Sequence, residues 1–129
     1  MYRILIADDD RDLLDTLRDA FIAFGYQVTT AENGQQAWDF FRTEPYDIVL
    51  LDVEMPFLNG MEAAKRMKQR RPEVPVILMT AYSHLYHPED VLSLDIEAFL
   101  RKPLNIQELL EVVEKIAGQQ SNDHTLPFA

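Results

Sequence analysis

The chain has 129 residues, the size of a single domain, and its hydrophobic share of 47% predicts a packed core rather than a disordered chain. It has no cysteine, which excludes disulfides, thiol catalysis and cysteine-based zinc sites. Acidic residues outnumber basic ones 22 to 12, giving a net charge of −10, so we expect no direct binding of nucleic acid, which requires Lys and Arg facing phosphates.

The first apolar run, residues 4–7, is too short for a secretory signal or a membrane span, so we expect a cytoplasmic protein with no membrane contact. Because the run is unbroken, it predicts a strand buried on both faces. Leucines and phenylalanines at helical spacing then predict a helix over about 11–24. The half-polar segment 27–31 predicts a strand nearer an edge of the sheet.

The middle of the chain continues this alternation. A second helix is predicted after Asn33, followed by a buried strand over 48–51. A third helix is predicted after Asn59, followed by a buried strand over 76–79. Three predicted helices share a capping signal, an Asn followed three residues later by Gln or Glu: Asn33 and Gln36, Asn59 and Glu62, Asn105 and Glu108.

The C-terminal third contains shorter elements. A proline suited to the first turn of a helix predicts a short helix over about 88–94, followed by a strand over 98–100 and a last helix around 109–116. The polar segment 119–129 predicts a frayed end or the start of a linker. We therefore expect one domain over residues 1–118.

Polar residues follow the predicted strands. Strands alternating with helices predict an α/β fold with a parallel sheet, and such sheets bind ligands at the carboxyl ends of their strands. Several polar side chains should meet at that edge: Asp8 and Asp9 after the first strand, Asp52 after the third, Thr80 after the fourth and Lys102 after the fifth.

The chemistry of this set favours phosphoryl transfer. Two carboxylates about 4 Å apart repel by roughly 4 kcal/mol at an effective dielectric constant near 20, so three of them need a counter-charge. Mg²⁺ suits carboxylates, water and phosphate oxygens. A carboxylate nucleophile, a metal, the lysine at 102 and the hydroxyl of Thr80 meet the needs of phosphoryl transfer through an aspartyl phosphate.

Each member alone has a simpler interpretation. Asp8 and Asp9 could belong to a helix start, and Asp52 could accept bonds from turn amides. Thr80 could close a strand, and Lys102 could be a solvated surface charge. The joint placement of these residues at four strand ends is what favours a functional site over a structural role.

The sequence also resembles the response-regulator receiver family. The motifs are Ile-Leu-Ile-Ala-Asp-Asp over 4–9, Leu-Asp-Val-Glu-Met-Pro over 51–56 with Asn-Gly at 59–60, Met-Thr-Ala over 79–81, and Lys-Pro at 102–103. The resemblance covers about residues 1–118. It implies a flavodoxin-like, doubly wound sheet of five parallel strands in the order 2-1-3-4-5 with five helices, and a cis bond before the proline at 103.

The resemblance implies roles at the metal site. Asp52 matches the phosphorylated aspartate, Asp9 a direct Mg²⁺ ligand, and Asp8 a neighbour that acts through water. Glu54 occupies the position whose backbone carbonyl binds the metal, so its side chain is not the expected ligand. Glu54 and Tyr82 also occupy positions where the family tunes the lifetime of the phosphoryl group.

The resemblance further implies a switch. Lys102 matches the lysine that contacts a phosphoryl oxygen, Thr80 the hydroxyl residue that turns toward the phosphoryl group, and Phe99 the aromatic that then moves inward. Residues 88–117 would form the face read by a downstream effector domain or protein. Asp95-Ile96 stands where the family often has Gly-Ala, which is a departure in that region.

These features predict a signalling phosphoacceptor rather than an enzyme, with a histidine kinase or histidine phosphotransfer protein as phosphoryl donor. One alternative is a phosphatase-like hydrolase that forms an aspartyl phosphate. Another is a decoy that is never phosphorylated and acts only by binding. The sequence leaves open whether the chain forms a homodimer.

Overall fold

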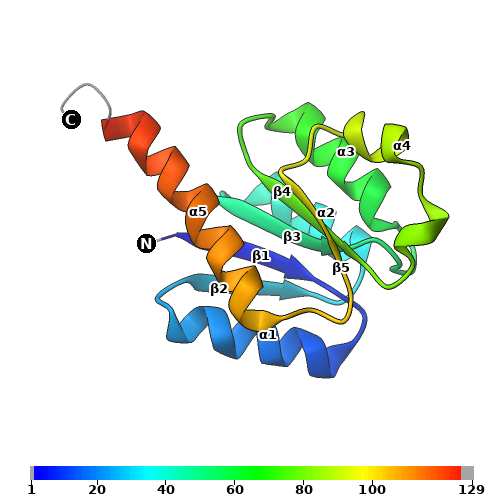
Figure 1. Cartoon of the computed structure of the whole chain (residues 1–129), viewed down its shortest axis with the longest axis horizontal. Coiled ribbons are helices and arrows are strands. Elements are labelled where there is room, and N and C mark those ends of the chain that lie inside the picture. Colours follow the sequence, from blue (N-terminus) through cyan, green and yellow to red (C-terminus); the bar gives the residue numbers. More distant parts are fainter. Residues whose placement is uncertain (1, 126–129) are drawn as a thin grey trace.

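The structure, a computed structural model that describes residues 2–125 with side chains to residue 119, is a five-stranded parallel sheet in the order β2-β1-β3-β4-β5 (Figure 1). The strands are β1 (Arg3–Ala7), β2 (Gln27–Ala31), β3 (Ile48–Asp52), β4 (Val76–Thr80) and β5 (Ala98–Arg101). The helices are α1 (Arg11–Ala23), α2 (Gly34–Thr43), α3 (Gly60–Arg70), α4 (Pro88–Leu92) and α5 (Ile106–Thr125), with a 3-10 turn η1 (Ser83–Leu85) before α4. The flavodoxin-like fold, the strand order and all five predicted strands are confirmed.

The sheet is buried on both faces because its central strands carry apolar side chains almost throughout. Successive side chains of a strand point to opposite faces, so alternate residues enter different cores. Figure 1 shows α1 and α5 on one side of the sheet, with α2 and α3 on the other. The core under α2 and α3 contains Leu5, Val49, Leu51, Val76 and Leu78, and the core under α1 and α5 contains Ile4, Ile6, Leu50, Ile77 and Met79.

Side-chain caps begin four helices, three of them at the predicted asparagines. The Asp10 side chain accepts hydrogen bonds from the backbone N–H groups of Asp12 and Leu13 at 3.1 and 3.2 Å. The side chains of Asn33, Asn59 and Asn105 accept from the N–H groups of Gln36, Glu62 and Glu108 at 2.8, 2.9 and 3.1 Å. These bonds satisfy early helical donors that have no partner within the helix.

The edge formed by β5 and α4 is only loosely packed. Neither the four residues of β5 nor the five residues of α4 include a buried one. Pro88 occupies the first turn of α4 as predicted, and the helix ends at Leu92, two residues before the predicted end. Pro88 has no N–H and disfavours helix in the residue before it, which separates α4 from η1.

A brace fixes the beginning of β5 to the rest of the sheet. The Lys68 Nζ of α3 donates to the carbonyl oxygen of Val74 at 2.9 Å and to Glu97 Oε1 at 3.0 Å. The other oxygen of Glu97 accepts from the N–H of Val76 at 3.1 Å. Glu97, the residue just before β5, therefore joins this strand to α3 and β4.

The last helix is longer than predicted. α5 continues to Thr125, where we predicted a frayed end or a linker after residue 118, and Figure 1 shows it projecting beyond the sheet. No proline interrupts the sequence until Pro127. The predicted tail residues 126–129 lie outside the described residues, and the domain boundary at 118 stays a prediction. Among the described helices, none combines the length and apolar character needed to cross a membrane.

Candidate functional site

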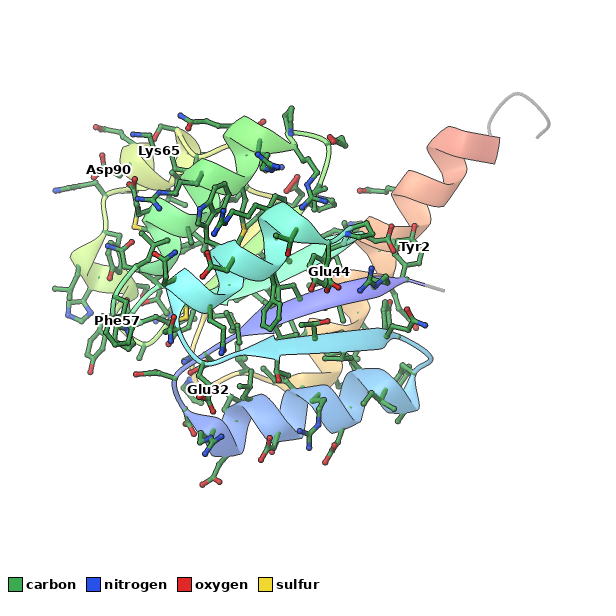
Figure 2. The ribbon with its side chains drawn as sticks, turned by 180° about the vertical axis from the view of Figure 1, so that it is seen from behind. Tyr2, Glu32, Glu44, Phe57, Lys65 and Asp90 are labelled. Carbon is green, nitrogen blue, oxygen red and sulfur yellow. The ribbon has the colours of Figure 1, made fainter. Side chains whose placement is uncertain are left out.

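The carboxyl ends of the strands form one edge of the sheet, here called the site edge. Figure 2 shows Glu32 and Phe57 at this edge, while Tyr2 and Glu44 lie at the opposite end of the sheet. The predicted site residues lie at the site edge: Asp8 and Asp9 after β1, Asp52 at the end of β3, Thr80 at the end of β4, and Lys102 after β5. The predicted convergence of separate segments is confirmed.

Three carboxylates form an acidic cluster. One oxygen from each of Asp8, Asp9 and Asp52 lies within 4.8 Å of the others. Asp8 is fully buried and Asp52 is 3% exposed, whereas Asp9 faces solvent. Asp52 Oδ1 is buried without a hydrogen-bond partner among the described residues. An unpaired buried carboxylate oxygen beside two further acids fits the ligand preference of a hard divalent cation such as Mg²⁺.

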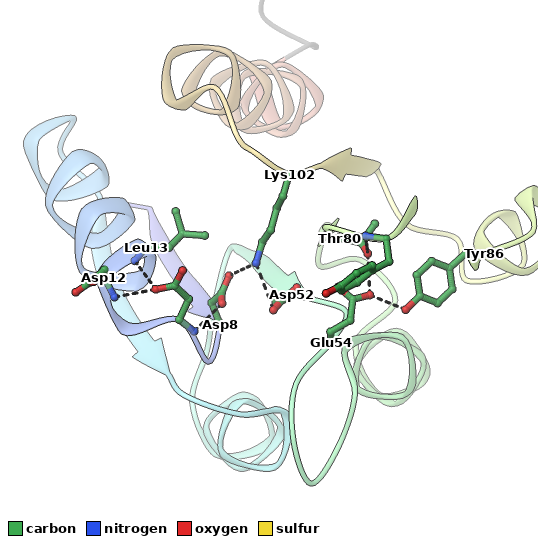
Figure 3. Close-up of polar contacts among 10 residues, drawn as sticks. Asp8, Asp12, Leu13, Asp52, Glu54, Thr80, Tyr86 and Lys102 are labelled. Carbon is green, nitrogen blue, oxygen red and sulfur yellow. Dashed lines mark hydrogen bonds and ion pairs between the residues drawn. The ribbon is translucent and has the colours of Figure 1, made fainter. Parts of the chain in front are cut away.

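Lys102 supplies the positive charge of the cluster (Figure 3). Its Nζ lies 2.8 Å from Asp8 Oδ2 and 3.4 Å from Asp52 Oδ2. Burial lowers the pKa of Lys102, but its hydrogen bond to Asp8 and the charges of Asp52 and Asp8 outweigh burial and raise the pKa above its ordinary value. The lysine is therefore a permanent cation. The peptide bond between Lys102 and Pro103 is cis, which confirms the prediction from the family resemblance.

The pKa of Asp52 is strongly perturbed. Burial and the charge of Asp8 raise it, Lys102 opposes them, and Glu54 adds to the rise, leaving the pKa at about 7 rather than 3.8. A carboxyl group with that pKa is largely protonated below neutral pH and is then a poor nucleophile. A bound cation would favour its ionised form, so nucleophilic chemistry at Asp52 and cation binding belong together.

A glycine allows α3 to approach the end of β3. The N–H of Gly60 donates to the carbonyl oxygen of Val53 at 2.8 Å. A Cβ added at Gly60 would lie 2.1 Å from the backbone oxygen of Asp52. The Asn-Gly pair at 59–60 therefore has two local functions, one residue capping α3 and the other allowing the helix to pack against the segment that carries Asp52.

The Glu54 side chain points away from the acidic cluster. Its Oε2 accepts hydrogen bonds from Thr80 Oγ1 at 2.7 Å and from the Tyr86 hydroxyl at 2.5 Å (Figure 3). Thr80 is fully buried, and its Oγ1 also accepts from the N–H of Tyr82 at 2.9 Å. The side chain of Glu54 is thus engaged in hydrogen bonds outside the acidic cluster.

Tyr86 is a site residue that sequence reasoning missed. Its ring meets that of Phe99 edge to face, with centroids 6.2 Å apart and an interplanar angle of 77°. Burial, followed by the hydrogen bond and charge of Glu54, raises the pKa of Tyr86 to about 12, so its hydroxyl stays a donor at physiological pH. The sequence offers one weak signal, an aromatic hydroxyl in the loop that follows Thr80.

Comparisons with known proteins agree with this geometry. A family model described as response regulator receiver domain matches residues 4–114. Sporulation initiation phosphotransferase F of Bacillus subtilis (strain 168) is 38% identical over 120 residues, 93% of this chain and 97% of that protein. Regulatory protein AtoC of Escherichia coli (strain K12) is 34% identical over 119 residues, 92% of this chain but 26% of that protein.

A solved structure agrees as well. The crystal structure of response regulator protein TrrA from Thermotoga maritima in complex with Mg²⁺-BeF has a TM-score of 0.81 and 37% identity. The match covers 90% of this chain and 99% of that chain. The similarity thus extends over nearly the whole fold.

Proposed function

This chain belongs to the response regulator receiver family, and on that premise we propose that it accepts a phosphoryl group on Asp52. The observation that carries the proposal is the Asp52 carboxylate, which is buried, has an oxygen without a hydrogen-bond partner among the described residues, and lies beside Lys102 and two further acids. The donor would be a phosphohistidine of a histidine kinase or a histidine phosphotransfer protein. The chain would be a signalling phosphoacceptor rather than an enzyme with a separate substrate.

In the proposed reaction, an oxygen of Asp52 attacks the phosphorus atom. The bond between phosphorus and the donor imidazole nitrogen breaks, and the nitrogen keeps the electron pair. Lys102 would neutralise one phosphoryl oxygen, as its position 3.4 Å from Asp52 Oδ2 favours. The Thr80 hydroxyl would donate a hydrogen bond to another phosphoryl oxygen.

The acidic cluster would hold the cation of this reaction. The donor set would be Asp9 and Asp52 directly, Asp8 through water, and the backbone carbonyl of Glu54. Mg²⁺ bound there supplies positive charge that neutralises the phosphoryl oxygens. The unpaired, buried Asp52 Oδ1 supports this assignment.

The response to phosphorylation would pass through Thr80 and Phe99 to the face over residues 88–117. Movement of Thr80 toward the phosphoryl group would vacate space that Phe99 can fill. A downstream effector domain or protein would read the changed face, in the cytoplasm and without direct contact of this chain with nucleic acid. The open packing of α4 and β5 supports a role for this edge in the response.

The proposal is tested by incubating the chain with Mg²⁺ and acetyl phosphate and measuring the intact mass. We expect one added phosphate that is labile to base, and none in Asp52→Asn or after removal of Mg²⁺ with a chelator. Asp10→Asn is a matched control, because Asn caps a helix as well as Asp and residue 10 already caps α1. Phosphate on Asp52→Asn, or steady release of phosphate from many esters, would contradict the proposal.

A further inference from the structure

The Thr80 hydroxyl already donates a hydrogen bond in this structure. A hydroxyl has one proton to donate, and that of Thr80 goes to Glu54 Oε2 at 2.7 Å. The oxygen is held from the other side by the N–H of Tyr82 at 2.9 Å. To donate to a phosphoryl oxygen, Thr80 must therefore first give up its bond to the Glu54 carboxylate.

Glu54 is in turn held by Tyr86. The Tyr86 hydroxyl donates at 2.5 Å to the same oxygen that accepts from Thr80, and Figure 3 shows this oxygen between the two donors. Hydrogen bonds to a charged acceptor are the strong ones, and here two converge on one atom. Glu54 is thereby fixed facing Thr80 rather than free to turn toward solvent.

The ring of Tyr86 contacts Phe99, the second residue of the proposed switch. The Tyr86 ring packs edge to face on Phe99, and this aromatic pair joins the loop after η1 to the edge strand β5. Tyr86 thus contacts Phe99 directly and reaches Thr80 through Glu54. It joins residues that are 19 positions apart along the chain.

We propose that Tyr86 is a positioning residue that holds the resting arrangement of the site: through Glu54 it keeps the Thr80 hydroxyl away from Asp52. The inference rests on the proposed function, because it concerns how Thr80 becomes available to a phosphoryl group. Removing the Tyr86 hydroxyl would loosen Glu54, free Thr80 and favour the phosphorylated form. The simpler view, that Tyr86 only anchors its loop, predicts no such gain.

The test is Tyr86→Phe, which removes the hydroxyl and keeps the ring on Phe99. The probe is beryllofluoride with Mg²⁺, a mimic of the phosphoryl group. We expect the variant to bind this probe about fivefold or more tightly than the parent, within the range of coupling between linked sites. Tyr46→Phe is the matched control, because the Tyr46 hydroxyl also donates to a glutamate, Glu44, at 3.2 Å but at the opposite end of the sheet (Figure 2).

A double-mutant cycle separates positioning from general loosening. In a Thr80→Ala background there is no hydroxyl to release, so Tyr86→Phe should leave probe affinity unchanged. An equal gain in both backgrounds, or unchanged or weaker binding in the Thr80-containing chain, would overturn the inference. A gain confined to chains that contain Thr80 supports it.

A measurement without metal or probe distinguishes failure of this inference from failure of the proposed function. In metal-free protein, the three-bond couplings of the Thr80 side chain report its χ1 rotamer by NMR, and Tyr86→Phe should increase rotamer averaging while Tyr46→Phe does not. Unchanged couplings together with unchanged affinity would overturn the inference. If the parent chain shows no binding that depends on Asp52, the proposed function fails, while the couplings still decide the role of Tyr86.

Discussion

The central strands and the edge formed by β5 and α4 differ in how deeply their side chains are buried. Every residue of β3 and β4 is buried, and α1, α2 and α3 all bury side chains against the sheet. No residue of β5 or α4 is buried. The same sheet therefore has a closely packed centre and an open edge.

The difference shows how one small fold can hold like charges close together in its centre and still have a loosely packed edge. Repelling carboxylates at Asp8 and Asp52 stay close because Asp8 follows β1 and Asp52 ends β3, two buried strands that close packing keeps in place. Phe99 and Tyr86 lie on the open edge, where fewer apolar contacts resist rearrangement. The carboxylates proposed for chemistry are thus closely packed, whereas Phe99 and Tyr86, proposed for the response, are only partly buried.

The largest expected effect on the free energy of unfolding is in the closely packed centre. Phe21 of α1 is fully buried, so Phe21→Ala should lower the free energy of unfolding by about 3–5 kcal/mol, as for other buried aromatics. Its neighbour Ile22 is 53% exposed, so Ile22→Ala should change that free energy by no more than about 0.5 kcal/mol. Urea unfolding measures both. A loss below about 1 kcal/mol at Phe21 would contradict close packing here.

The next effect concerns charge within the packed centre. Because the folded pKa of Asp52 is about 7 and its ordinary value is 3.8, the folded state binds more protons between these values. The free energy of unfolding contributed by this group is therefore present at low pH and lost as pH rises from about 4 to about 7.

Asp52→Asn removes this loss. The metal-free variant should be more stable than the metal-free parent at pH 8 by up to about 4 kcal/mol, since each pKa unit corresponds to about 1.4 kcal/mol. The difference should shrink toward pH 4. Urea unfolding at both pH values in a chelator measures it, and addition of Mg²⁺ should stabilise the parent more than the variant. Equal stability of the two chains at pH 8 would argue against a cost of burying the ionised Asp52 beside Asp8.

A smaller effect is expected where α3 meets the packed centre. Gly60→Ala places a Cβ against the backbone oxygen of Asp52, so the helix start must shift, lowering the free energy of unfolding by about 1–3 kcal/mol and slowing phosphorylation. Gly118→Ala in α5 is the control, since a Cβ there meets nothing within 4 Å and should stabilise the helix by about 0.5–1 kcal/mol. Chemical unfolding curves compare the two, and an unperturbed Gly60→Ala would refute the close approach.

The smallest effect is expected at the open edge. Leu92 of α4 is 78% exposed, so Leu92→Ala should change the free energy of unfolding by no more than about 0.5 kcal/mol. Amide hydrogen exchange should also be faster in α4 than in α3. Slow exchange in α4, or a large loss of stability, would remove the contrast between the two regions.

Short-range patterns made much of the fold predictable. The unbroken apolar runs 48–51 and 76–79 predicted buried strands, and three asparagines marked helix starts, since both signals depend on neighbouring residues. Asp52 and Lys102 could be placed at one edge because parallel strands end there. The family resemblance supplied the strand order and the cis bond.

The contacts around Glu54 could not be predicted in this way. Its partner Tyr86 lies 32 residues further along the chain in a loop, and no periodicity fixes where a loop side chain points. The length of α5 was also missed, because its polar continuation carries no apolar stripe to indicate a helix. Local sequence thus indicated the candidate site residues but not the hydrogen bonds that Thr80 and Tyr86 donate to Glu54.

The brace at Glu97 has a mechanical consequence. One end of β5 is clamped to α3 and β4 through Lys68 and Val76, while the other end leads to Lys102 at the site edge. The far end is also held, because the Lys102 N–H donates to the Thr80 carbonyl oxygen of β4 at 2.8 Å. With both ends of β5 joined to β4, rearrangement at this edge should involve side chains such as Phe99 more than the backbone of the strand.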